Sequence, residues 1–458
     1  MNHWAVCHKC LGRGKKNIKL CKKARWRFQV AIKAFEQDKN AIRPQITQYR
    51  CDHCEGTGLV SAAHSPEVKA SYPRVAIIGA GIGGVALAVA CYHRGIPFDL
   101  YERDQSFDAR SQGYGLTLQQ ASNAIKGLGL FLLKEGVHST RHVVHDTEGK
   151  IISEWGVRTH STIKEFPRRK NVHIPRQALR LALLEQLGSS NRVQWGHRLV
   201  GLKQNELTFQ VDNEIKRANA DLIVGADGIR SSLRSLIIRE DITPLRYLGY
   251  IVILGICSLD ALKGIESPLL DSSTVFQTVN GHERIYMMPY SKGKIMWQFS
   301  FPIPENEAKI LSAQGSKALK EEACRRTKWH LPIPQIVSAT LSEQISGYPV
   351  YDRELLAPQQ LKDAGSVTLI GDSAHPMSPF KGQGANQALL DALSLARKIS
   401  TTPNWKERGI REAILAPFEE EMLARSASKV STSAEAAEFL HSPYVLREGN
   451  NPKGRCFK

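Results

Sequence analysis

The sequence predicts an α/β fold with a parallel-sheet domain, an inserted β-sheet domain, C-terminal helices and a small N-terminal cysteine module. Three observations lead to this prediction. An apolar run enters a glycine-rich turn at Val75–Gly84, a second apolar run ends at Gly371–Asp372, and two Cys-x-x-Cys-x-Gly-x-Gly segments precede both. With 458 residues, 42% of them hydrophobic, the chain can bury a large core.

The first glycine segment indicates a strand, a tight turn and a helix. Val75–Ile78 is apolar and β-branched, as expected of a buried parallel strand. Gly79, Gly81 and Gly84 fit G-x-G-x-x-G, in which the glycines permit the turn, the approach of a pyrophosphate and close packing of the helix. We expect that helix over Val85–His93, with its free N–H groups facing the anion.

An acidic residue follows at the spacing that dinucleotide sites use. A second strand is predicted over Phe98–Glu102, and Glu102 stands about 20 residues after the glycines, where a carboxylate can bind a ribose hydroxyl. Strand, helix and acid together argue against a chance glycine cluster. Val75–Tyr92 is uncharged and long enough for a membrane helix, but its glycines lie at turn spacing, so no transmembrane segment is predicted.

Two later segments repeat the strand-to-turn pattern. The strand ending at Gly225 leads to Asp227-Gly228, followed by a short basic helix. Val367–Ile370 reads as a strand that enters Gly371-Asp372, and a helix is predicted over Asn386–Lys398. The chain from Gly371 therefore approaches the same cofactor as the first glycine turn.

At this point the chain resembles the single-component flavoprotein monooxygenases of the p-hydroxybenzoate-hydroxylase-like group (class A). G-x-G-x-x-G, a central D-G and G-D-x-x-H-x-x-x-P-x-x-G-x-G occur in that order, and the resemblance covers Arg74–Ser442. Gly371–Asn386 looks similar to the tetracycline-inactivating and other aromatic-ring monooxygenases. The resemblance implies a Rossmann-like FAD-binding domain with an inserted substrate domain. It also implies hydroxylation of an aromatic or polycyclic small molecule with NAD(P)H and O2, through a flavin C4a-hydroperoxide.

The motifs and the resemblance together predict the cofactor contacts. For Arg103 and Arg110, an exposed surface arginine remains the alternative. No catalytic residue is assigned, and His375 is expected to have a structural or ring-packing role rather than to act as a base. The predicted cofactor-binding residues are Gly79, Gly81, Gly84, Glu102, Arg103, Arg110, Arg176, Asp227, Asp372, Pro379, Gly382, Gly384 and Asn386.

The helix that follows Gly382-Gln383-Gly384 suits a flavin. Glycines let the backbone approach a flat ring, and a helix N-terminus presents N–H donors and partial positive charge. Such preorganised donors favour the reduced flavin anion at small reorganisation cost. Pro379 and Phe380 are expected to shape the wall beside the ring.

The segment between the D-G and G-D motifs is predicted to form a sheet over the flavin. Its aromatic residues either line the substrate cavity or belong to the core of the sheet, and both interpretations stay open. The predicted strands are Tyr247–Ser258, Ser273–Val279, Arg284–Pro289 and Lys294–Phe301. The candidate lining residues are Tyr250, Phe276, Tyr286, Met288, Trp297 and Phe299.

The two cysteine segments predict a closed structural zinc site. Cys7, Cys10, Cys51 and Cys54 supply the four thiolates that such a site needs, and the repeat resembles the cysteine-rich zinc domain of DnaJ-type co-chaperones. Redox-active CxxC pairs are the alternative. The 40 residues between the knuckles carry apolar residues at helical spacing, which predicts a helical insert.

Residues 1–74 hold 15 Lys/Arg and 5 Asp/Glu, a large part of the net charge of +18. This basic module favours an acidic partner, either a protein or a nucleic acid, although a solvated basic face would look the same. Cysteines that look reduced and the lack of a signal peptide favour a cytoplasmic location.

The domain boundaries follow from these segments. Residues 1–60 form the zinc-binding module, 61–73 a linker, and 74–240 the first part of the FAD-binding domain. Residues 241–345 form the substrate domain, 346–442 the second part of the FAD-binding domain with the C-terminal helices, and 443–458 a tail. Two other functions remain open: a flavin-dependent reductase or dehydrogenase, and a zinc-module binding protein with a non-catalytic flavoprotein body. A halogenase is disfavoured because no W-x-W-x-I-P segment occurs.

Overall fold

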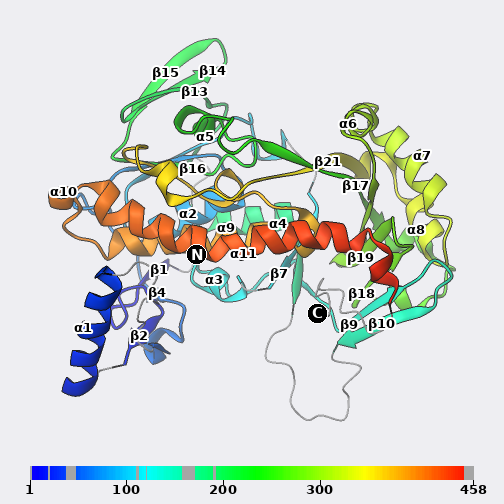
Figure 1. Cartoon of the computed structure of the whole chain (residues 1–458), viewed down its shortest axis with the longest axis horizontal. Helices are drawn as coiled ribbons and strands as arrows, with labels where there is room; N and C mark the ends of the chain where they lie inside the picture. Colours follow the sequence, from blue (N-terminus) through cyan, green and yellow to red (C-terminus); the bar gives the residue numbers. More distant parts are fainter. Residues whose placement is uncertain are drawn as a thin grey trace.

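A computed structural model describes residues 3–18, 21–37, 48–109, 113–119, 121–156, 171–188 and 192–447. Its main features are a parallel five-stranded sheet, a mixed seven-stranded sheet and a small N-terminal module (Figure 1). The predicted α/β class, with an inserted sheet between two parts of a Rossmann-like domain, is confirmed.

The parallel sheet brings the three glycine-containing loops to one edge. All four neighbouring pairs of its strands run parallel. Three adjacent strands enter the three motifs, so the motifs lie side by side although about 290 residues separate the first from the last. In spatial order the strands are β12 (Val193–Gln194), β6 (Phe98–Tyr101), β5 (Val75–Ile78), β16 (Leu222–Gly225) and β22 (Val367–Leu369).

Three helices pack together beside this sheet: α2 (Ile82–Tyr92), α4 (Arg176–Glu185) and α9 (Gly384–Ser400). Helix α2 begins three residues before the predicted Val85, so part of the glycine motif lies in its first turn. The reason is steric, since an ideal Cβ on Gly84 would lie 1.8 Å from the carbonyl oxygen of Gly79. With only hydrogen there, the helix can start against the turn itself.

The inserted domain supplies β17 to β20 of a seven-stranded sheet, and these match the four predicted strands, whereas β9, β10 and β21 come from segments outside or at the end of residues 241–345. All neighbouring strands are antiparallel except β9 and β18, which run parallel. In spatial order the strands are β10 (Ile151–Gly156), β9 (Arg141–His145), β18 (Thr274–Val279), β19 (Arg284–Ser291), β20 (Lys294–Pro302), β17 (Leu245–Ser258) and β21 (Ile345–Arg353).

Alternation along these strands separates a core face from a face that meets the FAD-binding domain. Phe276, Trp297 and Phe299 are fully buried in a cluster with residues of α6 (Glu305–Ala313), α7 (Ser316–Arg326) and α8 (Ile333–Ala339). For these three aromatics the sheet-core interpretation is therefore the right one. Tyr250, Tyr286 and Met288 lie in a different cluster, which includes Phe380 of the late glycine motif.

The remaining elements support these two sheets. A three-stranded sheet of β7 (Gly115–Leu118), β11 (Val172–Pro175) and β8 (Val137–His138) contacts the seven-stranded sheet. None of the helices in the described ranges is long and apolar enough to cross a membrane. The other elements are β13 (Arg198–Lys203), β14 (Glu206–Val211), β15 (Glu214–Asn219), α3 (Ser122–Lys126), α5 (Ser232–Ile237) and α10 (Trp405–Arg408).

The longest of the predicted C-terminal helices is α11 (Ala416–Leu440), which crosses the molecule from one sheet to the other (Figure 1). A π-helical turn at Arg411–Leu415 precedes it. Within α11, Glu419 is 1% exposed and accepts a hydrogen bond from Arg411 Nη1 at 2.6 Å. Burial raises the pKa of Glu419 to about 7, although Arg411 opposes this shift.

This buried carboxyl predicts a pH-dependent stability. The contribution of Glu419 is fully present below pH 4.5 and is lost as the pH rises through 7, because the folded state then gives up a proton that burial favours. The Glu419→Gln variant cannot ionise at this position. Between pH 4.5 and pH 8 its free energy of unfolding should therefore fall less than that of wild type, by up to about 3 kcal/mol. Urea unfolding of both proteins at pH 5 and pH 8 measures the difference. Parallel pH profiles would show that Arg411 compensates the charge fully.

The N-terminal module consists of two small β-ribbons and one helix. Strand β1 (His3–Val6) pairs with β4 (Leu59–Ala62), and β2 (Lys15–Asn17) pairs with β3 (Gln48–Arg50). The predicted helical insert between the knuckles is α1 (Lys22–Gln37), which extends away from the body (Figure 1). The module contacts the body through Trp4, whose ring lies 4.6 Å from that of Phe131.

Candidate functional site

The three motif loops converge where β5, β16 and β22 end. Gly79 has a φ of +101°, and an ideal Cβ there would lie 2.7 Å from the carbonyl oxygen of Ala226, so the first loop presses against the second. The second loop is bonded to the third, because the backbone N–H of Gly228 donates to Ser373 Oγ at 3.0 Å. The arrangement follows the rule that ligands bind at the carboxyl ends of parallel strands.

Asp372 lies in a recess beside these loops. Its side chain remains solvent accessible, yet desolvation by the surrounding protein raises its pKa despite the nearby charges of His375 and Arg176. Tyr114 behaves in the same way, being 42% exposed with a pKa raised by desolvation. A side chain that is open to solvent and yet surrounded closely enough by protein to be desolvated must line a concave space. Tyr348, which interacts with both, shares this environment.

The N-termini of α2 and α9, together with Arg176, border the same recess. Arg176 is the first residue of α4, as predicted, and its guanidinium lies 5.8 Å from the ring centroid of Tyr114. An ideal Cβ on Gly81 would meet only Arg176 Nη2, at 3.9 Å, and one on Gly384 would lie 3.3 Å from Asp372 Oδ1. The N-termini of α2 and α9 thus present backbone N–H groups and partial positive charge next to open space.

Glu102 lies beside the first glycine turn. It is 8% exposed, and its two carboxylate oxygens accept hydrogen bonds from the backbone N–H groups of Ala80, at 2.7 Å, and Asp104, at 3.1 Å. These bonds fix the carboxylate next to Gly81 and leave each oxygen a further lone pair for a ribose hydroxyl. Arg103 is exposed beside it.

Asp227 holds the second and third loops together. Its Oδ1 accepts hydrogen bonds from Ser231 Oγ at 2.5 Å and Ser373 Oγ at 3.2 Å, and its Oδ2 accepts one from the backbone of Leu233 at 3.2 Å. Burial raises the pKa of Asp227, and these hydrogen bonds oppose the shift. The described contacts of Asp227 are therefore with protein groups, and its predicted contact with the cofactor stays a prediction.

Asn386, at the start of α9, also makes its described hydrogen bonds with protein groups. Its Oδ1 accepts hydrogen bonds from the backbone of Gln119 and Ala121, and its Nδ2 donates to the carbonyls of Thr117 and Gly382, both at 2.9 Å. These four bonds use its full hydrogen-bonding capacity, and the residue is 1% exposed. Asn386 thus positions the loop around Gly382, which has a φ of +59°.

His375 belongs to a buried ion-pair network rather than to the recess. Its Nε2 lies 2.7 Å from Asp391 Oδ2, which also accepts a hydrogen bond from the backbone of Gly371 at 2.9 Å. Arg425 donates to the other oxygen of Asp391. Burial alone would lower the pKa of His375, but the carboxylate of Asp391 outweighs it and the pKa is raised. This geometry favours the structural role that the sequence predicted.

The substrate sheet presents a buried cation toward the late glycine motif. Arg284 is 4% exposed, its Nε donates to Gln277 Oε1 at 2.8 Å, and its Nη1 has no hydrogen-bond partner among the described residues. The guanidinium lies 4.9 Å from the ring centroid of Tyr286 and 6.0 Å from that of Phe380. Burial lowers the pKa of Arg284 to about 10, so it remains a cation at neutral pH.

Two predicted positions remain to be placed. Pro379 begins a single 3₁₀ turn, Pro379–Lys381, which contacts α11 and presents Phe380 to the substrate sheet. Arg110 lies outside the described residues, so its proposed contact with the flavin stays a prediction.

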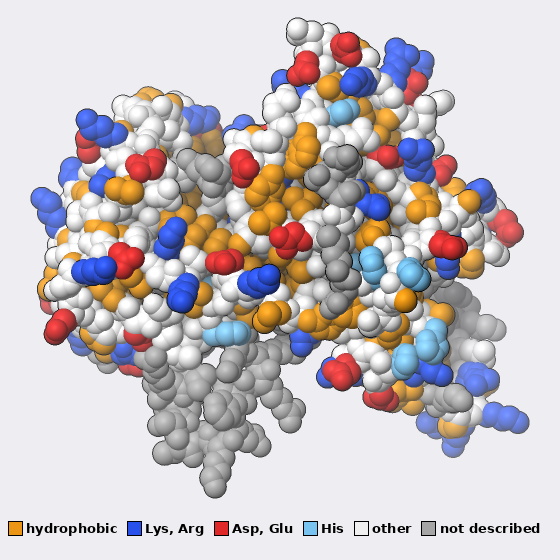
Figure 2. All heavy atoms as spheres, turned by 180° about the vertical axis from the view of Figure 1, so that it is seen from behind, with side chains coloured by type: hydrophobic (Ala, Val, Ile, Leu, Met, Phe, Trp, Pro, Cys, Tyr) orange, Lys and Arg blue, Asp and Glu red, His pale blue; other side chains and the backbone are white. Residues whose placement is uncertain are grey.

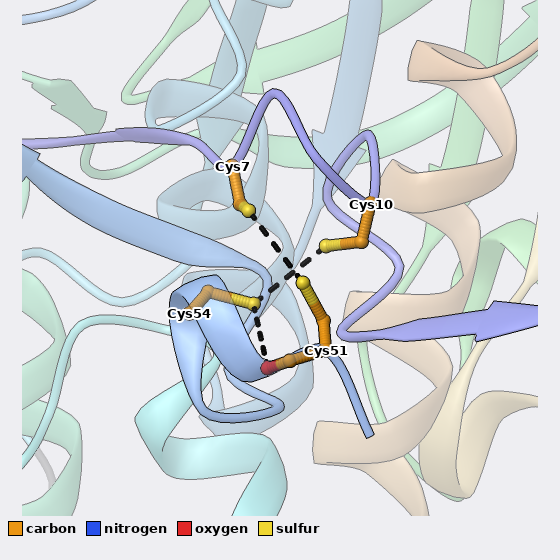
Figure 3. A group of neighbouring side chains, drawn as sticks. All are labelled: Cys7, Cys10, Cys51 and Cys54. Atoms are coloured by element: carbon orange, nitrogen blue, oxygen red, sulfur yellow. Dashed lines mark hydrogen bonds between the residues drawn. The ribbon is translucent and has the colours of Figure 1, made fainter. Parts of the chain in front are cut away.

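The four predicted cysteines meet in the N-terminal module. Figure 3 shows their side chains pointing toward one another, and all four sulfur atoms lie within 4.8 Å of one another. Cys7 Sγ and Cys51 Sγ are 4.0 Å apart, and Cys10 Sγ and Cys54 Sγ are 3.6 Å apart. All four residues are buried.

This geometry fits a tetrahedral zinc ion. Zn–S bonds of about 2.3 Å at tetrahedral angles place sulfur atoms about 3.8 Å apart, close to the two separations above. The backbone N–H groups of Gly14 and Gly58 donate to Cys10 Sγ and Cys54 Sγ, each at 3.2 Å. Such N–H···S bonds are the outer contacts that orient metal ligands.

The sequence reasoning missed Asp391 and Arg284. Asp391 is a carboxylate on the otherwise apolar face of a predicted helix, and a charge at a core position was an available signal. Arg284 begins a predicted strand, and no sequence pattern showed that its side chain would be buried opposite Phe380. The partners of Asp391 lie 16 to 34 positions away in other elements, and Arg284 meets Phe380 of the late glycine motif, so only the fold brings each group together.

Comparison with known proteins agrees with this geometry. A protein family described as "FAD binding domain" matches residues 72–430. Aurachin C monooxygenase/isomerase of Stigmatella aurantiaca is 31% identical over 330 residues, which cover 71% of this chain and 80% of that protein.

Solved structures share the fold. HpxO of Klebsiella pneumoniae, complexed with FAD and uric acid, superposes with a TM-score of 0.66 at 23% identity, covering 81% of this chain and 90% of that one. The tetracycline destructase Tet(51) gives a TM-score of 0.58 at 18% identity, covering 82% of this chain and 94% of that one. The predicted resemblance is thereby confirmed for the body of the chain.

Proposed function

Since this chain belongs to the FAD-binding-domain family and is an FAD-dependent monooxygenase, we propose that it uses NAD(P)H and O2 to hydroxylate an aromatic or polycyclic small molecule. The observation that supports this most directly is the recess between the parallel sheet and the seven-stranded sheet. The N-termini of α2 and α9 border it, Asp372 and Arg176 line it, and the substrate sheet approaches it through Phe380.

The described residues fit FAD. Gly81 leaves room for a pyrophosphate at the start of α2, Glu102 is held for the adenosine ribose, and Asp372 is held for the ribityl chain. When bound, the flavin supplies the redox chemistry, and the protein orients it and excludes water. Gly384 places the N–H groups of α9 where they would stabilise negative charge on the ring.

On the substrate side, Arg284 would bind an acceptor oxygen of the substrate. Its free Nη1 is a buried donor without a partner among the described groups, which favours a ligand carrying a carboxylate, phenolate or carbonyl. Arg284→Met should raise KM for the substrate and leave the flavin content unchanged. An unaltered KM would place the substrate elsewhere.

The oxygenation itself is tested by substrate-stimulated NAD(P)H consumption. With the correct aromatic compound, we expect faster NAD(P)H oxidation and a product that contains one atom from ¹⁸O₂. Substrate conversion without label would instead show a flavin-dependent reductase or dehydrogenase. A colourless protein that retains metal and does not take up FAD would favour a binding protein with a non-catalytic body.

We further propose that the N-terminal module binds zinc through Cys7, Cys10, Cys51 and Cys54. The described sulfur positions fit a tetrahedral ion and leave no open coordination position, so the metal would be structural rather than catalytic. Metal analysis of the purified protein should give about one zinc per chain. Redox-active CxxC pairs would instead yield disulfides on mild oxidation and no stoichiometric metal.

An acidic partner for this module is part of the same proposal. Lys22, Lys23, Arg25 and Arg27 are exposed on α1 together with Trp26, which is 64% exposed. Figure 2 shows Lys and Arg side chains gathered on the protruding part at the lower right, where the module lies. Replacing the four cations by glutamate should abolish salt-sensitive binding to an acidic protein or nucleic acid.

The domain boundaries given above and a cytoplasmic location belong to this proposal as well. The location is supported by the eight cysteines of the described ranges, none of which forms a disulfide. The boundary near residue 60 is supported by the end of β4 at Ala62 and by the start of the family match at residue 72.

A further inference from the structure

The zinc module rests on two arginines of the FAD-binding domain, of which Arg94 is buried and Arg397 is half-buried. Arg94 follows α2 directly and is 2% exposed, and Arg397 lies in the last turn of α9. Arg94 Nη1 donates to the carbonyl of Ala90 at 2.9 Å, and Arg397 Nη2 donates to the carbonyl of Thr57 in the second knuckle at 3.3 Å. Neither guanidinium forms an ion pair within the described part of the chain, and Arg94 Nε, Arg94 Nη2 and Arg397 Nε lack hydrogen-bond partners there.

Both guanidinium groups touch the cysteine knuckles through glycines. An ideal Cβ on Gly12 would lie 3.6 Å from Arg94 Nη2, and one on Gly58 would lie 3.3 Å from Arg397 Nη2. Larger residues would therefore separate the arginines from the sulfur cluster. The electrostatic influence of Cys10 reaches both arginines, and that of Cys54 reaches Arg397. Burial, with a contribution from the charge of Arg397, lowers the pKa of Arg94 to about 9.

The charge of Glu421 also reaches Arg397, but less strongly than that of the two cysteines. Two cations without an ion pair are costly where the protein shields them from water, unless a further negative group lies nearby. A four-thiolate zinc centre is such a group. Binding of one Zn²⁺ to four thiols releases four protons and leaves a complex with a net charge of −2. The two arginines carry +2, which equals in size the charge of the metal centre itself.

We infer that Arg94 and Arg397 are the counter-cations of a zinc–tetrathiolate centre, through which the metal clamps the N-terminal module onto the C-terminal ends of α2 and α9. This inference rests on the proposed zinc site and goes beyond it. The N-termini of the same helices border the cofactor recess. They lie about 16 Å from the C-terminal end of α2 and about 25 Å from the C-terminal end of α9, measured along each helix. The metal therefore stabilises the two helices that carry the cofactor turns, at a distance that excludes contact with the flavin.

The test compares full-length wild type with Arg94→Met/Arg397→Met, each with zinc and after chelation under reducing conditions. With zinc, wild type should have the higher Tm, because its arginines balance the dianion. Without zinc the order should reverse, because wild type then keeps two cations without an ion pair in partly desolvated places, whereas the variant has apolar side chains there. Arg198→Met/Arg325→Met, at two exposed positions, is the matched control and should show no reversal.

Zinc affinity is the second readout, and it can be measured even when the zinc-free protein does not stay folded. Competition with a chromophoric chelator should show zinc binding weakened by about 10- to 100-fold in the double variant, the range seen for residues around metal ligands. Arg94→Lys/Arg397→Lys keeps both charges and should restore most of the affinity. Equal destabilisation in both metal states, with unchanged zinc affinity, would overturn the counter-cation role and leave the zinc site standing.

Failure of the zinc site itself would look different. Wild type would then contain no metal, and its Tm would not respond to the chelator. Cys51→Ser would match wild type in both measurements. That result would remove the proposed metal centre and, with it, this inference.

Discussion

Asp372→Ala should weaken FAD binding by roughly 10- to 150-fold, because a charge-assisted hydrogen bond contributes about 1.5–3 kcal/mol. Asp372 lies between the N-termini of α4 and α9 and keeps an accessible surface in a desolvated recess. The purified variant should lose most of its yellow colour. The measurement is the FAD-to-protein ratio after gel filtration, followed by titration with added FAD.

The structure also predicts how this variant differs from a misfolded one. Desolvation raises the pKa of Asp372, so the empty site bears a cost for keeping this carboxylate ionised. Removing it should therefore leave the Tm of the FAD-free protein unchanged or higher while FAD affinity falls. Asp363→Ala, at an exposed position before β22, is the control and should retain FAD. Full flavin content in Asp372→Ala would refute this cofactor site.

Cys51→Ser should reduce the zinc content from about one per chain to below about one tenth, because a serine hydroxyl does not replace a thiolate in a structural zinc site. Its sulfur lies 4.0 Å from that of Cys7, inside the four-cysteine cluster. We expect the flavin content at 25 °C to remain that of wild type, since the recess and the cluster lie at opposite ends of α2 and α9. The Tm should fall because the metal no longer holds the module.

Cys324→Ser provides the matched control, because Cys324 is a half-buried thiol of α7 far from the cluster in sequence. It should keep both zinc and FAD. Stoichiometric zinc in Cys51→Ser, or equal metal loss in Cys324→Ser, would contradict the four-thiolate assignment.

The sequence predicted the elements that enter the cofactor site, because their patterns are local. Val75–Ile78 is an uninterrupted apolar run that is buried throughout, and Gly79 and Gly84 after it stand where a Cβ would clash with backbone atoms. The strands of the inserted sheet were also predicted closely, since their apolar runs end at turns. The four cysteines could be grouped from spacing alone, and their sulfur atoms do meet.

The sequence could not predict which polar groups the fold uses internally. The predicted contact of Asn386 with the cofactor stays a prediction, but no local pattern indicated that its side-chain amide is saturated by Gln119, Ala121, Thr117 and Gly382, because only the folded chain brings these partners together. The same holds for Asp391 and for Arg94 and Arg397. A buried charge acquires its role from its neighbours, and those of Arg397 include Thr57, 340 positions earlier in the chain.

The contact between Thr57 and Arg397 has a consequence for the order of events during synthesis. These residues are 340 positions apart, so at roughly 5–20 residues per second the ribosome completes the docking site about 20–70 seconds after the second knuckle. The paired cysteines are only 44 positions apart, and the knuckles can close around an ion long before then. If the module binds zinc as proposed, it is therefore assembled before the ribosome completes α9, which carries Arg397.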